Sequence, residues 1–171
     1  SDRSMLLWET GVGEPLSVLE PKGSSAWLSS SDRFIAANDK PWVTIMDLAK
    51  GLVLKRFKPF PKRTAALAFH PEENRLAAGG QGDAIRFFSL PECDQVHEIT
   101  QAHQGFVLSL VFSPCGRYLA STGLEQRLRL WSSGDLRLLG EVSLKNQGVQ
   151  SLAYASEGAV IAVASDYCVT L

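Results

Sequence analysis

One arrangement of short apolar segments recurs along this chain at intervals of about forty residues. In its clearest copy, alternating apolar and polar residues predict strands at 107–112, 118–121 and 127–131, with a turn at Pro114-Cys115-Gly116. Residues 136–142 predict a fourth strand. Because no helical pattern lies between the four segments, we expect small antiparallel sheets.

The same layout is found on both sides of this copy. The residue that closes the third strand falls at Trp8, Met46, Phe88 and Trp131, with separations of 38, 42 and 43 residues. Four-stranded units with a period of about 40–45 residues are typical of β-propeller blades. We therefore predict an all-β propeller segment over 1–171. Its expected units are the end of a blade at 1–20, whole blades at 22–57, 60–99 and 103–142, and the start of another at 148–171.

Three segments resemble motifs of the WD-repeat (tryptophan–aspartate) β-propellers. Residues 1–9 are similar to the third-strand motif of that family, with Glu9 in place of its final Asp. Residues 112–121 resemble the turn between the first and second strands, and Ala102-His103 stands where the family has Gly-His. Since a ring of seven such blades needs roughly 290 residues, we expect this chain to form an arc of a larger, seven-bladed ring.

The resemblance also implies a hydrogen-bond network that is structural rather than catalytic. In the clearest copy its members are a loop His, a second-strand Ser, a turn carboxylate and the third-strand Trp, namely His103, Ser121, Glu125 and Trp131. Glu125 replaces the Asp of the family, and Asp2 and Asp166 occupy that position in the terminal copies. The two middle copies have Lys40 and Gly82 there, so we expect them to depend on packing between neighbours.

The composition limits where in the cell a protein of this sequence is expected to act. The chain has 17 basic and 18 acidic residues, and its apolar runs are far shorter than the roughly 18 residues of a membrane helix. Its three cysteines (Cys93, Cys115, Cys168) have no Cys-x-x-Cys spacing, which favours neither disulfides nor zinc. We therefore expect an intracellular protein, cytoplasmic or nuclear, without a transmembrane segment.

No set of residues has the spacing of a catalytic centre. His70 and His97 lie far apart in the repeat, and no nucleophile or metal-ligand pattern accompanies them. The segment 79–82 (Gly-Gly-Gln-Gly) lacks the Lys-Ser/Thr of a phosphate-binding loop, and a hairpin turn with positive φ explains it better. The sequence thus indicates a non-enzyme without cofactor or metal.

The charge is unevenly spread. Residues 55–63 hold five basic side chains and no acidic one: Lys55, Arg56, Lys58, Lys62 and Arg63. Two prolines stiffen this connection, and Phe57 and Phe60 are candidates to stack on a ligand. One interpretation is an anion site for RNA or a phosphoinositide. The alternative is a solvated connection between blades.

The main functional prediction is a protein–protein interaction scaffold that docks a peptide or subunit of a larger complex on its top-face loops. In the resembling family, binding positions flank the first strand and the second turn of each blade. The corresponding residues here are Phe106, Leu108, Leu124, Arg63, Ala65 and Gln150. Phe106 and Leu124 are the strongest candidates, because they are apolar where exposure is expected.

Overall fold

The computed structural model describes residues 5–8, 15–19, 25–144, 149–158, 160–165 and 169–170, and the side chains of 25–144, 149–158 and 160–164. These residues form strands and turns, and among them there is no helix able to cross a bilayer. The strands pair into five antiparallel sheets, each built from strands that are consecutive in the chain.

Three of the sheets have four strands each. The first consists of β3 (Ser25–Leu28), β4 (Phe34–Asp39), β5 (Trp42–Asp47) and β6 (Leu52–Phe57). The second consists of β7 (Thr64–Phe69), β8 (Arg75–Gly80), β9 (Ile85–Ser89) and β10 (Gln95–Ile99). The third consists of β11 (Val107–Phe112), β12 (Tyr118–Gly123), β13 (Arg127–Ser132) and β14 (Leu138–Ser143).

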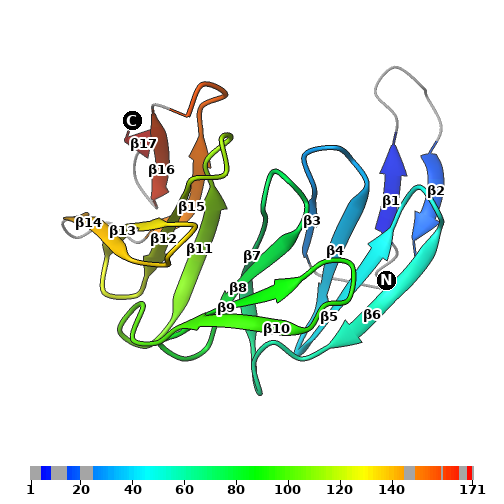
Figure 1. The fold of residues 1–171 in the computed structure, drawn as a ribbon, viewed down its shortest axis with the longest axis horizontal. Coiled ribbons are helices and arrows are strands. Elements are labelled where there is room, and N and C mark those ends of the chain that lie inside the picture. The colour runs from blue at the N-terminus through cyan, green and yellow to red at the C-terminus, as the bar shows by residue number, and fades with distance from the viewer. Residues whose placement is uncertain are drawn as a thin grey trace.

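Two smaller sheets flank them. One pairs β1 (Met5–Trp8) with β2 (Pro15–Leu19), and the other contains β15 (Val149–Tyr154), β16 (Ile161–Ser165) and β17 (Val169–Thr170). The sheets follow one another in chain order along an open arc (Figure 1). The first strands lie side by side, since β3 contacts β7, β7 contacts β11 and β11 contacts β15. The predicted fold class, a β-propeller that forms part of a ring, is confirmed.

Adjacent sheets share their apolar cores. Alternate residues of a strand point to opposite faces of its sheet. The side chains of β9 therefore contribute to two apolar clusters, one shared with each neighbouring sheet. Phe87 packs with Phe112 and Trp131 of the β11–β14 sheet. The next residue, Phe88, packs in a different cluster with Phe34 of the β3–β6 sheet. Burial of one such phenylalanine stabilises the fold by about 1.5–3 kcal/mol, so each sheet depends on the one beside it.

Antiparallel pairing places the connections at two opposite ends of the sheets. At one end, here called the rim, lie the connections between sheets and the turns between second and third strands, such as β12–β13. At the other end, called the base, lie the turns between first and second and between third and fourth strands, such as β11–β12 and β13–β14. Residues far apart in sequence therefore meet at each end.

Strand limits differ from the predicted ones mainly in the fourth strand of the β11–β14 sheet. This strand begins at Leu138 rather than at Leu136. Leu136 has a φ of 58°, which places it in the turn after β13. The register between β13 and β14 also shifts between Leu130 and Trp131. An alternating apolar pattern does not reveal a single left-handed residue of this kind.

The glycines at 79–82 meet two different requirements, and the sequence suggested only one of them, the positive φ. Only Gly82 has a positive φ, of 122°. Gly79 and Gly80 lie within β8. A Cβ on Gly80 would lie 2.9 Å from the Thr64 Cα and collide with the Arg63 backbone, and one on Gly79 would meet the Val107 side chain at 2.5 Å. Close approach of neighbouring chain therefore requires these two glycines.

Gly80→Ala should lower the free energy of unfolding by about 2 kcal/mol or more, because backbone cannot move aside as a flexible side chain can. Gly140→Ala is the matched control, since a Cβ at Gly140 has no neighbour within 4 Å among the described residues. Chemical denaturation of both variants checks this. Equal stability of the two would contradict the close-approach role of Gly80.

Candidate functional site

Three of the predicted partner-binding residues meet at the rim. The Leu124 backbone N–H donates to the Phe106 carbonyl at 3.1 Å, and the Arg63 guanidinium lies 5.4 Å from the centre of the Phe106 ring. Leu124 is 60% exposed, Arg63 is exposed and Phe106 is half-buried. An apolar side chain, an aromatic ring and a cation thus share one surface.

The surface continues onto the turn that follows β8. The Gln81 N–H donates to the Arg63 carbonyl at 2.8 Å, and Gln81 pairs with Phe106 in an isolated bridge between the two sheets. Next to it, Pro61, Lys62 and Gln81 line a cavity of about 210 Å³. We call Lys62, Arg63, Gln81, Phe106 and Leu124 the rim surface.

The other three predicted residues lie together elsewhere. Ala65, Leu108 and Gln150 come from β7, β11 and β15, and together with Trp27 of β3 they line a cavity of about 150 Å³. All four belong to first strands, which places this cavity on the inner side of the arc. The six predicted residues therefore form two groups, one at the rim and one among the first strands.

The basic stretch does not form a single patch. The Lys55 ammonium is turned toward the β9–β10 turn, where it lies 2.7 Å from Asp94 Oδ1. Arg56 and Lys58 both lie over the Trp42 ring, 5.0 and 4.4 Å from its centre. Arg56 is also 3.7 Å from Asp39 Oδ2. Of the five basic side chains, only Lys62 and Arg63 contribute to the rim surface.

The suggestion that Phe60 stacks on a ligand is wrong, whereas Phe57 is half-buried. Phe60 is 2% exposed and belongs to the core between the β3–β6 and β7–β10 sheets. Phe57 packs against Phe88, with ring centres 4.8 Å apart. Both rings stabilise the fold, and the buried Phe60 ring is not available to a partner.

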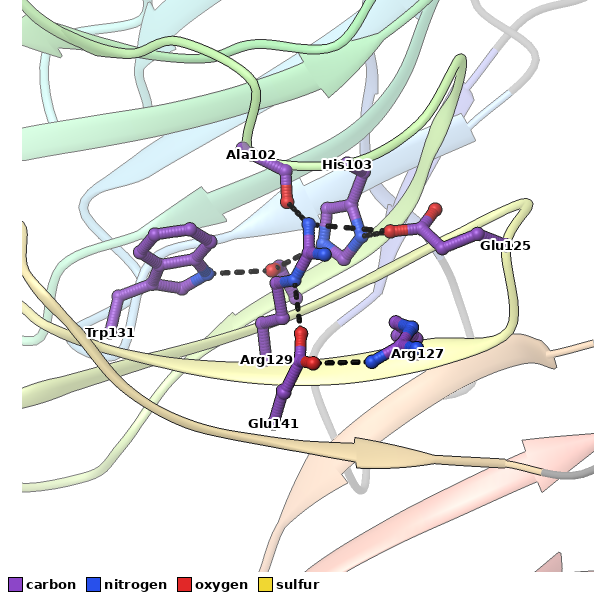
Figure 2. Close-up of polar contacts among 8 residues, drawn as sticks. Ala102, His103, Glu125, Arg127, Arg129, Trp131 and Glu141 are labelled. Atoms are coloured by element: carbon purple, nitrogen blue, oxygen red, sulfur yellow. Dashed lines mark hydrogen bonds and ion pairs between the residues drawn. The ribbon is translucent and has the colours of Figure 1, made fainter.

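The four residues of the expected network are connected (Figure 2). Trp131 Nε1–H donates to Ser121 Oγ at 2.8 Å, and Ser121 Oγ lies 2.6 Å from His103 Nε2. His103 Nδ1 lies 2.7 Å from Glu125 Oε1. A carboxylate can only accept here, so Nδ1 carries the proton and Nε2 accepts the Ser121 hydroxyl. The chain of donors is then complete from Trp131 to Glu125.

Burial lowers the pKa of His103, although the Glu125 carboxylate opposes this shift. Burial is also the main cause of the lowered pKa of His70, which lies at the base, with Nε2 2.9 Å from the Gly116 carbonyl. Both imidazoles are therefore neutral near pH 7. Hydrogen bonds within the protein occupy both ring nitrogens of each histidine, so these side chains hold turns together.

An arginine missed by the sequence reasoning joins the network to the loop before β11. Arg129 donates to the Ala102 carbonyl, and its Nη1 lies 3.4 Å from Glu125 Oε1. Its Nε donates to Glu141 Oε2 at 3.1 Å, and Arg127 donates to the other oxygen of Glu141 (Figure 2). The alternation of arginines in β13 with Glu141 in β14 was the available signal, because cross-strand pairs of opposite charge attract.

The β7–β10 sheet uses an apolar version of the same arrangement. Phe60 precedes β7 by the same four positions that separate His103 from β11. Arg86 occupies the place of Arg129: it donates to the Pro59 carbonyl at 2.5 Å, and its guanidinium lies 4.9 Å from the centre of the Phe60 ring. A buried ring replaces the buried imidazole, and the backbone bond from the arginine is kept.

No arrangement for catalysis is found in the described parts of the chain. These residues include no cluster of three or more His, Cys, Asp or Glu side chains able to hold a metal ion. Cys93 is buried, which raises the pKa of its thiol to about 11. Cys115 is exposed, and hydrogen bonds with Ser113 and then Arg117 lower its pKa to about 7, but no base or acid completes a reactive set. Cys168 lies outside the described residues.

Comparison with known proteins identifies one repeat directly. Residues 93–132 match the family described as WD domain, G-beta repeat. The chain is 28% identical over 105 residues to Topless-related protein 3 of Arabidopsis thaliana, a match that covers 61% of this chain and 10% of that protein. It is 28% identical over 96 residues to transcription initiation factor TFIID subunit 5 of Caenorhabditis elegans, over 56% of this chain and 15% of that protein. The chain thus spans only a small part of these relatives.

Ser121→Ala should lower the free energy of unfolding by about 1–3 kcal/mol, because it leaves the Trp131 N–H and His103 Nε2 buried without partners. Thr122→Val is the matched control. The Thr122 hydroxyl is buried and has no hydrogen-bond partner among the described residues, so its removal should cost almost nothing. Urea denaturation of both variants measures the difference, and a stable Ser121→Ala protein would show that the network is dispensable.

Stability should fall as the pH drops below about 6.5, because the histidines of the unfolded chain then take up protons while His70 and His103 stay neutral. The loss should continue until each folded-state pKa is reached. Thermal melts between about pH 7.5 and 5.5 should show a flatter pH dependence for the double variant His70→Gln/His103→Gln. His97→Gln, at an exposed position on β10, is the control and should retain the wild-type slope.

Proposed function

We propose, on the premise that this chain is part of a WD-repeat β-propeller, that it is a non-catalytic scaffold whose rim surface docks a peptide or subunit of a multi-subunit complex. The observation that carries this proposal is the exposed Leu124 side chain beside Phe106, with Arg63 over the ring. Aromatic and arginine residues are enriched where binding energy concentrates in protein interfaces.

The geometry supports a protein partner more than a polyanion. The Lys55 ammonium is turned to Asp94 in the β9–β10 turn at the base, away from Lys62 and Arg63, so the five basic side chains do not form one continuous track of the kind that RNA or an anionic membrane needs. One of the similar proteins is named as a subunit of TFIID. That name is consistent with a subunit role in an assembly.

The three predicted residues among the first strands, Ala65, Leu108 and Gln150, extend the proposed site. Ala65 and Leu108 lie two residues beyond Arg63 and Phe106 in sequence, so a bound segment that rests on the rim surface can reach the cavity lined by Ala65, Leu108 and Gln150. The volume of about 150 Å³ suits one small apolar or polar side chain. We expect the rim to supply most of the affinity and this cavity to supply selectivity.

Phe106→Ala should weaken capture of the partner by the full-length protein at least about tenfold, while the thermal midpoint stays close to that of the wild type. The reason is that a half-buried ring contributes more to the rim surface than to the core. Quantitative affinity capture, compared with Leu52→Ala as a control at an exposed outer-strand position, measures the effect. Retention of the same partners by Phe106→Ala would rule out this site.

The charge reversal Lys62→Glu/Arg63→Glu distinguishes the anion-binding alternative from the binding of a protein partner. Binding of RNA or phosphoinositide vesicles that falls steeply with salt and disappears in this variant would favour the alternative. Binding of a protein partner should instead depend only shallowly on salt, although this variant weakens it because Arg63 is part of the rim surface.

A further inference from the structure

A second concave site lies at the base, at the opposite end of the strands from the rim surface. It has a volume of about 600 Å³ and is formed by the β7–β8, β11–β12 and β13–β14 turns, so it straddles two sheets. Its charged lining consists of three arginines, Arg75, Arg117 and Arg137, and one acid, Glu72. We call this the base pocket.

Arg75 is the fixed element of the base pocket. Its Nη1 donates to the Ser133 carbonyl at 2.9 Å and its Nη2 to the Ser133 hydroxyl at 3.0 Å. These bonds join β8 to the turn after β13. A guanidinium has five N–H donors, more than Ser133 uses, so an anion in the pocket can be bound by a side chain that is already held in place.

Arg117 and Arg137 are the exposed cations of the base pocket. Both are exposed; Arg117 lies over the Tyr118 ring at 5.7 Å and hydrogen-bonds to the exposed Cys115 thiol, and Arg137 Nε lies 3.7 Å from Asp135 Oδ2. An ion pair in water of this kind is worth little. The two guanidiniums can therefore turn toward a bound anion at small cost.

The remaining polar groups of the pocket oppose an anion only weakly. The Glu72 carboxylate accepts a hydrogen bond from Asn74 Nδ2 at 3.1 Å. His70 is neutral: its Nε2–H donates to the Gly116 carbonyl at 2.9 Å, and its Nδ1 accepts from the Glu72 N–H at 3.2 Å. Positive charge therefore dominates this concave surface.

We propose that the base pocket binds the phosphorylated serine or threonine side chain of a protein partner. Planar guanidiniums pair with phosphate oxygens through two parallel hydrogen bonds, and such charge-assisted bonds are about twice as strong as neutral ones. The Tyr118 ring and the Leu139 side chain on the wall offer apolar contact to the residues beside the phosphate.

A nucleic acid or a membrane fits this site less well. The three cations are confined to one pocket, whereas a polyanion needs a track of them. The turns around the pocket carry Glu72, Glu73 and Asp135, whose carboxylates repel an extended negative surface. A single phosphate on a peptide presents its charge only where the arginines are. This site is independent of the rim surface, so one molecule has two separate places for partners.

The test uses fluorescent peptide pools with a fixed central phosphoserine, phosphothreonine or serine and randomised flanks, measured by fluorescence anisotropy. The phosphorylated pools should bind at least about tenfold more tightly than the serine pool. Arg117→Glu/Arg137→Glu should remove this difference, and Lys40→Glu/Lys50→Glu, which makes the same charge change at exposed turn positions of the β3–β6 sheet outside both proposed sites, should leave it within about twofold. Unchanged thermal melts of both variants show that the fold is intact.

Three results would overturn the proposal. One is equal binding, or no binding, of the phosphorylated and serine pools. Another is an equal loss in the two double variants, which would indicate a general charge effect. The third is tighter binding of a uridine decanucleotide or of phosphoinositide vesicles that depends on Arg117 and Arg137, which would assign the pocket to a different class of ligand. If the rim surface proved not to bind a partner, the expected anisotropy results for the base pocket would stay the same.

Discussion

The structure depends on apolar packing between adjacent sheets. Neighbouring residues of β8 belong to different clusters: Ala77 packs toward the β11–β14 sheet, and Leu76 and Ala78 pack toward the β3–β6 sheet. In β12, Leu119 and Ala120 divide in the same way between the β7–β10 and β15–β17 sheets. The second strands β8 and β12 are therefore buried on both faces, and nearest-neighbour contacts between sheets supply most of the stability. Polar residues are left for the two ends of the strands, where both proposed sites lie.

Much of this was visible in the sequence. The period-two pattern and the repeat spacing predicted the sheets, and the WD-repeat resemblance, which the match at 93–132 confirms, indicated which polar residues to connect. The direction of the basic side chains was not visible, because Lys55 turns to Asp94 and Arg56 to Trp42 through contacts made only in the folded chain. Phe60 was predicted to contact a ligand for the same reason. It lies in a connection between strands, but in the folded chain its ring is buried in the core between two sheets. The base pocket, formed by three turns distant in sequence, left no local signal.

The matched repeat and the folded sheet are offset. Residues 93–132 contain β10, which belongs to the β7–β10 sheet, followed by β11, β12 and β13 of the next sheet. A unit of sequence therefore spans the border between two sheets. Insertion or loss of one whole unit would still leave four strands in each sheet, which explains how repeats can be added without disturbing the fold. It also means that the loop before β11, which carries His103, is anchored on both sides by strands of different sheets.

The arginine bonds to loop backbone have a thermodynamic consequence. Arg86 holds the Pro59 carbonyl and Arg129 holds the Ala102 carbonyl, whether the adjacent buried ring is a phenylalanine or a histidine. Loops fastened in this way have already lost most of their conformational entropy before a ligand arrives. Little further ordering then opposes association, so a modest contact area can give useful affinity. For the proposed scaffold, the recognition surface is then rigid before any partner binds.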